Sequence, residues 1–256
     1  MHIDNSIIKS YLQGSSSYKS HWIFDHILDN GEYIFEEPKK IEAEKVRNIY
    51  EKIQKNLTSF IPFNVELFSM LFSDWENKFN DINIVLAVGC PSPFDAMVRQ
   101  YNGREYMVFD LVRFLDYEQQ GKDILSVIIG MITHETAHIC IHADHSIDTC
   151  GYQQQLSYIT FDEGFAHLLA FTDQISKYDF CKIIEMHYEG SLQKLKAALS
   201  EEDFDQQKKY LQQSNCGAYW DKFAAISGKL YLASHMDHLC EIYKAGPSAM
   251  IHNMLE

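Results

Sequence analysis

Two histidines and a glutamate near the middle of the chain have the types and the spacing that bind a metal ion on a helix. They form the segment His134-Glu135-Thr136-Ala137-His138, an HExxH pattern. Because positions i and i+4 of a helix lie on one face, both imidazoles can bind the same ion, with Zn–N bonds of about 2.0–2.1 Å. Glu135 lies roughly 100° around the helix from His134. We therefore predict His134 and His138 as zinc ligands, and Glu135 as the general base that takes a proton from a zinc-bound water.

A carboxylate further along the chain is predicted to complete the site. A catalytic zinc site has three protein ligands and one open position for water. Glu163 follows His138 by 25 residues, which is enough for the first helix to end and for a second helix to present the carboxylate. Its neighbours are mostly apolar, and a buried glutamate is costly unless it is paired or bound to a metal. We predict Glu163 as the third ligand, and we expect Gly164 to let the second helix pack close to the first.

Four other side chains are alternatives for the third ligand. Asp144 has the spacing of a metzincin-like site, but such sites need a glycine where this chain has Ile141. His142 lies one helical turn beyond the motif, too far for the same ion, and His145 has no supporting neighbours. Cys90 stands 44 residues before the motif, an arrangement that resembles peptide deformylases, although their glycine-rich loop is absent here.

The composition is that of a globular, acidic protein. Of the 256 residues, 46% are hydrophobic and 13% aromatic, and the net charge at pH 7 is −14. This charge argues against a nucleic-acid partner and against an anionic membrane surface. The first residues form no apolar leader, no run approaches 18 apolar residues, and the cysteines form no CxxC pairs. We therefore expect a cytoplasmic protein with reduced thiols, although export without a cleaved signal stays open.

Hydrophobic periodicity predicts an α+β fold with a small sheet and a mostly helical C-terminal half. We expect a mainly helical region at 1–80 that is irregular up to residue 40, then a sheet with the motif helix at 81–145. A helical subdomain at 146–256 carries the third ligand, and 81–256 form one catalytic unit. Strands are expected at 82–88, which ends in a loop at 89–93, and at 105–109, which follows an Asn102-Gly103 turn. Helices are expected at 41–57, 65–79, 122–143, 153–171 and beyond, with breaks near 190, 215–217 and 246–247.

The motif and the later glutamate resemble those of the gluzincins, which are zinc peptidases with HExxH and a downstream glutamate ligand. More narrowly, HExxH followed by Glu163-Gly164-Phe165-Ala166 is similar to a group of bacterial Zn-dependent proteases. The resemblance extends from about residue 82 to the C-terminus and carries over at His134, Glu135, His138 and Glu163. It implies a zincin-like (thermolysin-like) core whose exposed edge strand, here 105–109, binds an extended peptide.

The resemblance also implies two supporting groups. Gluzincins stabilise the developing oxyanion with a tyrosine or histidine of the helical half, and we predict Tyr219 in this role. The alternatives are two other residues of that half, His235 and Tyr231. Related enzymes often have an acidic residue four positions after the ligand glutamate, where this chain has His167. Asp162 or Asp173 is expected to orient a ligand imidazole instead, because ligating histidines usually donate their second N–H.

Together these expectations predict a zinc-dependent peptidase that acts on a peptide or protein substrate. Two other functions stay open. With Cys90 as third ligand, the chain would be a deformylase-like amidohydrolase. With a fourth ligand from Cys90, Asp144 or His145, the site would be closed, and the chain would be a non-catalytic zinc-binding or interaction protein. Glu135 argues against the closed site, which needs no base.

Overall fold

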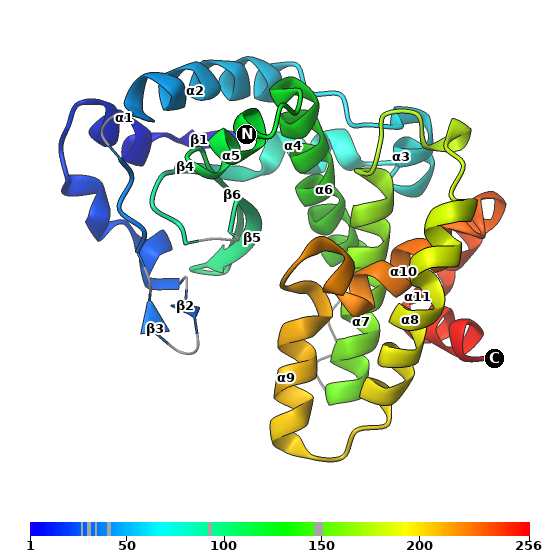
Figure 1. Ribbon diagram of the computed structural model, residues 1–256. Coiled ribbons are helices and arrows are strands. Elements are labelled where there is room, and N and C mark those ends of the chain that lie inside the picture. Colours follow the sequence, from blue (N-terminus) through cyan, green and yellow to red (C-terminus); the bar gives the residue numbers. More distant parts are fainter. Residues whose placement is uncertain (27, 30–31, 34, 40–41, 92–93, 146–150) are drawn as a thin grey trace. The chain divides into compact units, whose positions relative to one another are not determined.

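The computed structural model describes residues 1–26, 28–29, 32–33, 35–39, 42–91, 94–145 and 151–256. It confirms the α+β class, with a small mixed sheet and a helical C-terminal half (Figure 1). Tertiary contacts group the chain into two compact units, residues 1–61 with 76–135 and residues 62–75 with 136–256. The division passes through helix α6 (Ile124–Asp144), which continues unbroken across it.

The first unit is built on a four-stranded sheet with the strand order β1-β4-β6-β5. Its strands are β1 (His2–Asp4), β4 (Asn83–Ala87), β5 (Ala96–Tyr101) and β6 (Arg104–Asp110). β4 pairs in parallel with β1 and with β6, whereas β5 is antiparallel to β6. The strands predicted at 82–88 and 105–109 are thereby confirmed. A separate antiparallel pair is formed by β2 (Leu28–Asp29) and β3 (Glu32–Tyr33).

Two expectations about the sheet are wrong. β6 was expected to be an exposed edge strand, but it lies between β4 and β5 and is paired on both sides. The edges of this sheet are β1 and β5. Residues 1–40 are also not wholly irregular, since β1 forms by pairing with β4. The turn at Asn102 and Gly103 has φ values of 49° and 72°, as a two-residue hairpin requires, and it returns β5 into β6.

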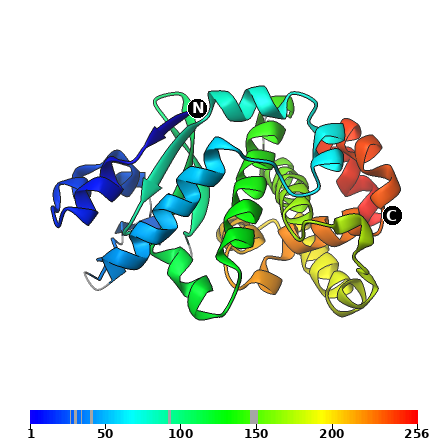
Figure 2. The same ribbon diagram turned by 90° about the horizontal axis from the view of Figure 1, so that it is seen from above.

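Apolar faces hold the helices of the first unit together. α1 (Ser6–Leu12) packs against β4 and α2 (Ala43–Thr58), and α2 also contacts α5 (Arg113–Gln119) (Figure 2). α2 confirms the helix predicted at 41–57, of which residue 41 lies outside the described residues. It buries four residues at helical spacing, Val46, Ile49, Ile53 and Leu57. The short helices near the N-terminus are η1 (Ser17–Ser20) and η2 (Trp22–His26).

The single helix predicted at 65–79 is wrong, because two helices occupy this segment. α3 (Val65–Leu71) belongs to the second unit, and all but the first residue of α4 (Trp75–Asp81) belongs to the first. Phe72 leaves the helical backbone conformation, with φ −123° and ψ 75°, while its ring is fully buried. Burial of this ring therefore outweighs the local helical pattern.

The second unit is a helical layer centred on α7 (Tyr152–Leu169) and α10 (Phe223–Ala233), which pack on each other. Two glycines make this crossing close. A Cβ on Gly164 would lie 2.9 Å from the carbonyl carbon of Gly228, and one on Gly228 would lie 2.1 Å from the carbonyl oxygen of Thr160. Gly164 therefore does permit a close helix approach, but the prediction that the motif helix is its partner is wrong.

The other helices of this unit surround that pair (Figure 1). Besides α3 and the end of α6, they are α8 (Cys181–Leu199), α9 (Phe204–Asn215), α11 (Leu239–Leu255) and the short η4 (Ile175–Lys177), η5 (Tyr219–Asp221) and η6 (Met236–His238). The break expected at Gly190 is wrong, because Gly190 lies inside α8. The other two breaks are confirmed: α9 ends at Asn215, and Gly246, with φ 82°, kinks α11.

α6 is long and apolar enough, by length and composition alone, to cross a membrane. In the most apolar 18-residue window of this helix, 67% of the residues are buried inside the protein. The core helix of a globular protein has the same composition. The burial of α6 is thus compatible with our expectation that no segment of this chain spans a membrane.

Candidate metal centre

Polar side chains gather between α6 and α7, although both helices are largely apolar. In the second unit, α6 contributes His138 and His142, and α7 contributes Asp162, Glu163 and His167. Most of their side-chain surface is enclosed, with exposed fractions between 9% and 22%. Because burial of ionisable groups is costly unless they are paired or bound to a metal, this cluster is the strongest candidate site of the chain.

Asp162 is the acceptor for two of these histidines. Its Oδ1 lies 2.8 Å from Nδ1 of His138, and its Oδ2 lies 3.4 Å from Nε2 of His142. Burial opposes ionisation of Asp162, but the two histidines lower the pKa of its carboxyl to about 2. Of the two aspartates expected to orient an imidazole, Asp162 therefore lies against His138. Asp173 lies beyond the end of α7, with Oδ1 3.3 Å from Oγ1 of Thr172.

Glu163 faces imidazoles with one oxygen and an amide with the other. Its Oε2 lies 3.4 Å from Nε2 of His167 and 4.0 Å from Nε2 of His138. Asn215, the last residue of α9, donates from Nδ2 to Oε1 of Glu163 at 2.9 Å. Glu163 and His167 share a face of α7 because they are one turn apart. One carboxylate oxygen is thus held in place while the other points at two nitrogen atoms.

The ring of His167 is deeply enclosed. Burial lowers its pKa well below the ordinary value, and the positive charges of Lys222, Lys229 and His138 act in the same direction. Its imidazole is therefore neutral at pH 7. The neutral form is the one that binds a metal ion, so this environment favours a ligand over an ion pair.

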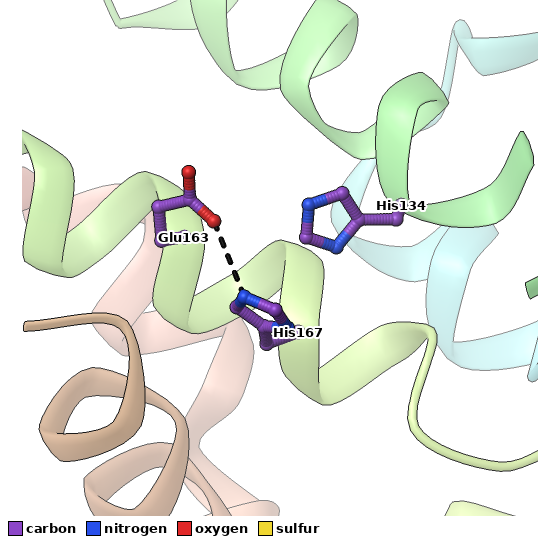
Figure 3. Close-up of side chains that lie close together, drawn as sticks. All are labelled: His134, Glu163 and His167. Carbon is purple, nitrogen blue, oxygen red and sulfur yellow. Dashed lines mark ion pairs between the residues drawn. The ribbon is translucent and has the colours of Figure 1, made fainter. Parts of the chain in front are cut away.

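The side chains form two groups in which the ligand atoms all lie within 4.8 Å of one another. One group is buried and comprises His138, His142 and Asp162, and it could hold a metal ion. The other comprises His134, Glu163 and His167, and Figure 3 shows the imidazole of His134 beside the two residues of α7. Although the unit boundary falls after Glu135, His134 is one turn from His138 on a continuous helix.

The predicted ligands therefore lie near one another, and His138 faces one residue of each group. Its Nδ1 faces Asp162 and its Nε2 faces Glu163. His142, which we judged too far for an ion bound by the motif, lies with Asp162 instead. Sequence reasoning missed His167 as a candidate ligand. The signal was present, since Glu163 and His167 have the same i, i+4 spacing as the two histidines of the motif.

The predicted catalytic residues have contrasting surroundings. Glu135 is buried on α6 with 4% of its surface exposed. Tyr219 begins η5, and its ring meets that of His167 edge-on at 5.4 Å. Its hydroxyl accepts a hydrogen bond of 2.8 Å from Nζ of Lys229. Burial lowers the pKa of Lys229 to about 7, and its Nζ lies 3.4 Å from the ring centroid of Phe171.

The alternatives to Tyr219 have other contacts. Nδ1 of His235 lies 2.8 Å from the backbone oxygen of Tyr231, one turn earlier in the chain. Burial raises the pKa of the Tyr231 phenol, and the side chain of Asn253 acts against this rise. Of these three residues, Tyr219 is the one whose contacts in the described part of the chain include His167.

Of the four alternatives for the third ligand, Asp144, His145 and Cys90 lie in neither group of the described residues. The hydroxyl of Tyr243 donates to Asp144 at 2.9 Å. The ring of His145 packs edge-on against Phe161 and Tyr243. Cys90 is fully buried, and burial, together with the charge of Asp110, raises the pKa of its thiol well above the usual value. Because the thiolate is the form that binds metals, this environment disfavours Cys90 as a ligand.

Comparisons of the chain with family models, with curated proteins and with solved structures give no match. The resemblance to the gluzincins therefore depends on the motif residues of the sequence alone.

Proposed function

We propose that this protein is a zinc-dependent peptidase of the gluzincin type with a zincin-like core, in which His134, His138 and Glu163 bind zinc. The observation that carries the proposal is that each ring nitrogen of His138 faces a different carboxylate. Its Nδ1 lies 2.8 Å from Asp162, while its Nε2 lies 4.0 Å from Oε2 of Glu163. Ligating histidines in zinc enzymes characteristically face the metal with one nitrogen and a carboxylate or carbonyl with the other.

The donor atoms fit zinc. Imidazole nitrogen and carboxylate oxygen are both common zinc ligands, and two histidines with one glutamate form a known catalytic set. The side chains of His138 and Glu163 are mostly enclosed, at 9% and 14% exposure, so a bound ion would be shielded from bulk water. When bound, zinc acidifies a water molecule and polarises the carbonyl of the bond to be cleaved.

The protein's own residues supply the proton transfers. Glu135 follows His134 on α6, and we assign to its carboxylate the role of taking a proton from water and passing it to the leaving amine. Tyr219 accepts a hydrogen bond from Lys229, and lysine in its protonated form can only donate. The phenol proton of Tyr219 is therefore directed away from Lys229 and can be donated to an oxyanion.

The proposed substrate is an extended segment of a peptide or protein, and we propose that it is cleaved in the cytoplasm. An extended peptide pairs with an unpaired sheet edge. β6 is internal and cannot serve as this edge. We therefore propose that the substrate pairs with β5, which lies at the edge of the four-stranded sheet beside β6. The acidic net charge of −14 disfavours nucleic acid as a partner.

The test separates zinc binding from catalysis. Wild-type protein is expected to contain one zinc per chain and to cleave members of a mixed peptide library. Glu135→Gln should keep the zinc but lose roughly 10²–10⁴-fold in cleavage rate, because it removes the base and leaves the ligands. Glu185→Gln, a change at an exposed position of α8, is the matched control and should behave as wild type. Undiminished cleavage by Glu135→Gln would refute the proposed base.

A further inference from the structure

The position four residues after Glu163 is where this chain departs from the gluzincin pattern. An acidic residue that orients a ligand is common there in related enzymes, and this chain has His167. In the structure the orienting acid is Asp162, which lies 2.8 Å from Nδ1 of His138. Position 167 is therefore not needed for orientation.

The distances around Glu163 indicate what His167 does instead. Its Nε2 lies 3.4 Å from Oε2 of Glu163. Hydrogen bonds between N–H and oxygen are usually 2.7–3.2 Å long, and the nearby contact of His138 with Asp162, at 2.8 Å, falls within this range. Two ligands bound to one zinc at about 2.0–2.1 Å, at the tetrahedral angle, lie about 3.3–3.4 Å apart. The spacing of His167 and Glu163 therefore fits two ligands of one ion.

Three nitrogen donors converge on this carboxylate. Nε2 of His138 lies 4.0 Å from the same Oε2, and the ligand atoms of His134, Glu163 and His167 all lie within 4.8 Å of one another (Figure 3). Asn215 holds the other oxygen of Glu163 at 2.9 Å, which keeps Oε2 directed at the histidines. The four side chains come from two helices, with one i, i+4 pair on each.

We propose that His167 is a fourth protein ligand of the metal, which is then bound by His134, His138, Glu163 and His167. This inference rests on the metal site of the proposed function and changes its chemistry. A donor set of three imidazoles and one carboxylate suits zinc, iron or nickel better than calcium or magnesium. With four protein ligands, a water can bind only if the metal takes a fifth ligand, as catalytic zinc does in some transition states.

Zinc affinity gives the first test. The affinity of the full-length protein is measured by competition with a chelator. His167→Ala should weaken binding by at least about 10-fold, since loss of an outer-shell partner alone costs that much. His187→Ala is the matched control, because His187 also lies on a helix of the second unit but stacks on Trp220. Wild-type affinity in His167→Ala would overturn the fourth ligand.

A second variant detects the ligand directly. Cobalt(II) is substituted for zinc, and His167→Cys should then show a sulfur-to-cobalt charge-transfer band that wild type and His187→Cys lack. This spectrum decides the question even where His167→Ala does not fold, and bound cobalt without the band would overturn the proposal.

The outcomes separate this inference from the proposed function. Wild-type protein that binds no zinc would refute both. Zinc binding that His167→Ala and His167→Cys leave unchanged would refute the fourth ligand and leave a three-ligand peptidase. The charge-transfer band in a protein whose wild type cleaves no peptide would support the ligand and refute the peptidase.

Discussion

Two deeply buried aspartates, Asp110 in the first unit and Asp162 in the second, have opposite acidities. Burial raises the pKa of Asp110 to about 6, whereas the pKa of Asp162 falls to about 2 although burial acts against this. The difference comes from their partners, because Asp162 faces His138 and His142. A buried carboxylate that faces imidazoles stays ionised and can support chemistry.

Asp110 has a structural role in which no metal-binding group of the described residues takes part. It ends β6 and accepts backbone hydrogen bonds from Cys90 at 2.6 Å, from Val112 at 2.9 Å and from Arg113 at 3.3 Å. These bonds tie the end of β6 to the loop after β4 and to the start of α5. The contrast shows that burial alone does not identify a functional acid.

The largest expected effect is on stability in the first unit. Asp110→Ala should lower the free energy of unfolding by about 3 kcal/mol, because three backbone N–H groups, two of them in buried hydrogen bonds, lose their acceptor. Urea unfolding measures the change, and Asp110→Asn, which keeps an acceptor oxygen, should cost less. Zinc content should be unchanged in both variants. A loss of zinc on either change would break the contrast between the two aspartates.

The second-largest effect is expected on the metal affinity of the second unit. Asp162→Asn should weaken zinc binding by roughly 10–100-fold, because Asp162 orients His138 and increases its basicity. Chelator competition measures this, with Asp110→Asn as the control. If the two variants bind zinc equally well, Asp162 has no part in a metal site.

The pH dependence of the metal-free protein should show opposite slopes for the two residues. Between about pH 4 and pH 6, Asp110 keeps its proton only in the folded state, so raising the pH lowers the free energy of unfolding, by up to about 2 kcal/mol. Asp162 is ionised in the folded state down to about pH 2, so its stabilisation is lost as the pH falls from about 4 to 2. The free energy of unfolding is measured against pH for both variants. Asp110→Asn should flatten the slope between about pH 4 and pH 6, and Asp162→Asn should flatten the slope between about pH 4 and pH 2. An unchanged profile in either variant would contradict the acidity assigned to that residue.

The smallest effect is expected for His142→Gln. Its contact with Asp162 is long, at 3.4 Å, so both the stability and the zinc affinity should change by less than about 1 kcal/mol. Chelator competition and urea unfolding measure these changes. A loss as large as that of Asp162→Asn would place the metal between His138, His142 and Asp162 instead.

The sequence predicted the parts of this molecule that carry their own pattern. α6 combined an apolar run with the motif, β4 was apolar from Ile84 onward, and the Asn102–Gly103 turn required two positive φ values. Prediction from the sequence failed where contacts with residues distant in the chain determine the local structure. β1 has only three residues and exists through its pairing with β4. Phe72 breaks a helical pattern because its ring is buried.

The candidate site shows the same limit. The motif located His134, Glu135 and His138, and the spacing to a second apolar helix located Glu163. Adjacent residues of that helix point about 100° apart, so the different surroundings of Asp162 and Glu163 depend on the helix rotation, which the spacing leaves open. The sequence also could not predict that Asn215, 52 residues beyond Glu163, holds one of its oxygens.

The close approach of Gly164 to Gly228 has a consequence for the metal-free protein. Where backbone meets backbone, no side-chain rotamers have to be ordered, and the residue next to Glu163 is fixed by the crossing of α7 and α10. The carboxylate is thus preorganised before any ion arrives. We therefore expect removal of the metal with a chelator to leave the helical unit folded, and readdition to restore the site without a refolding step, unlike small zinc domains that unfold when the ion is lost.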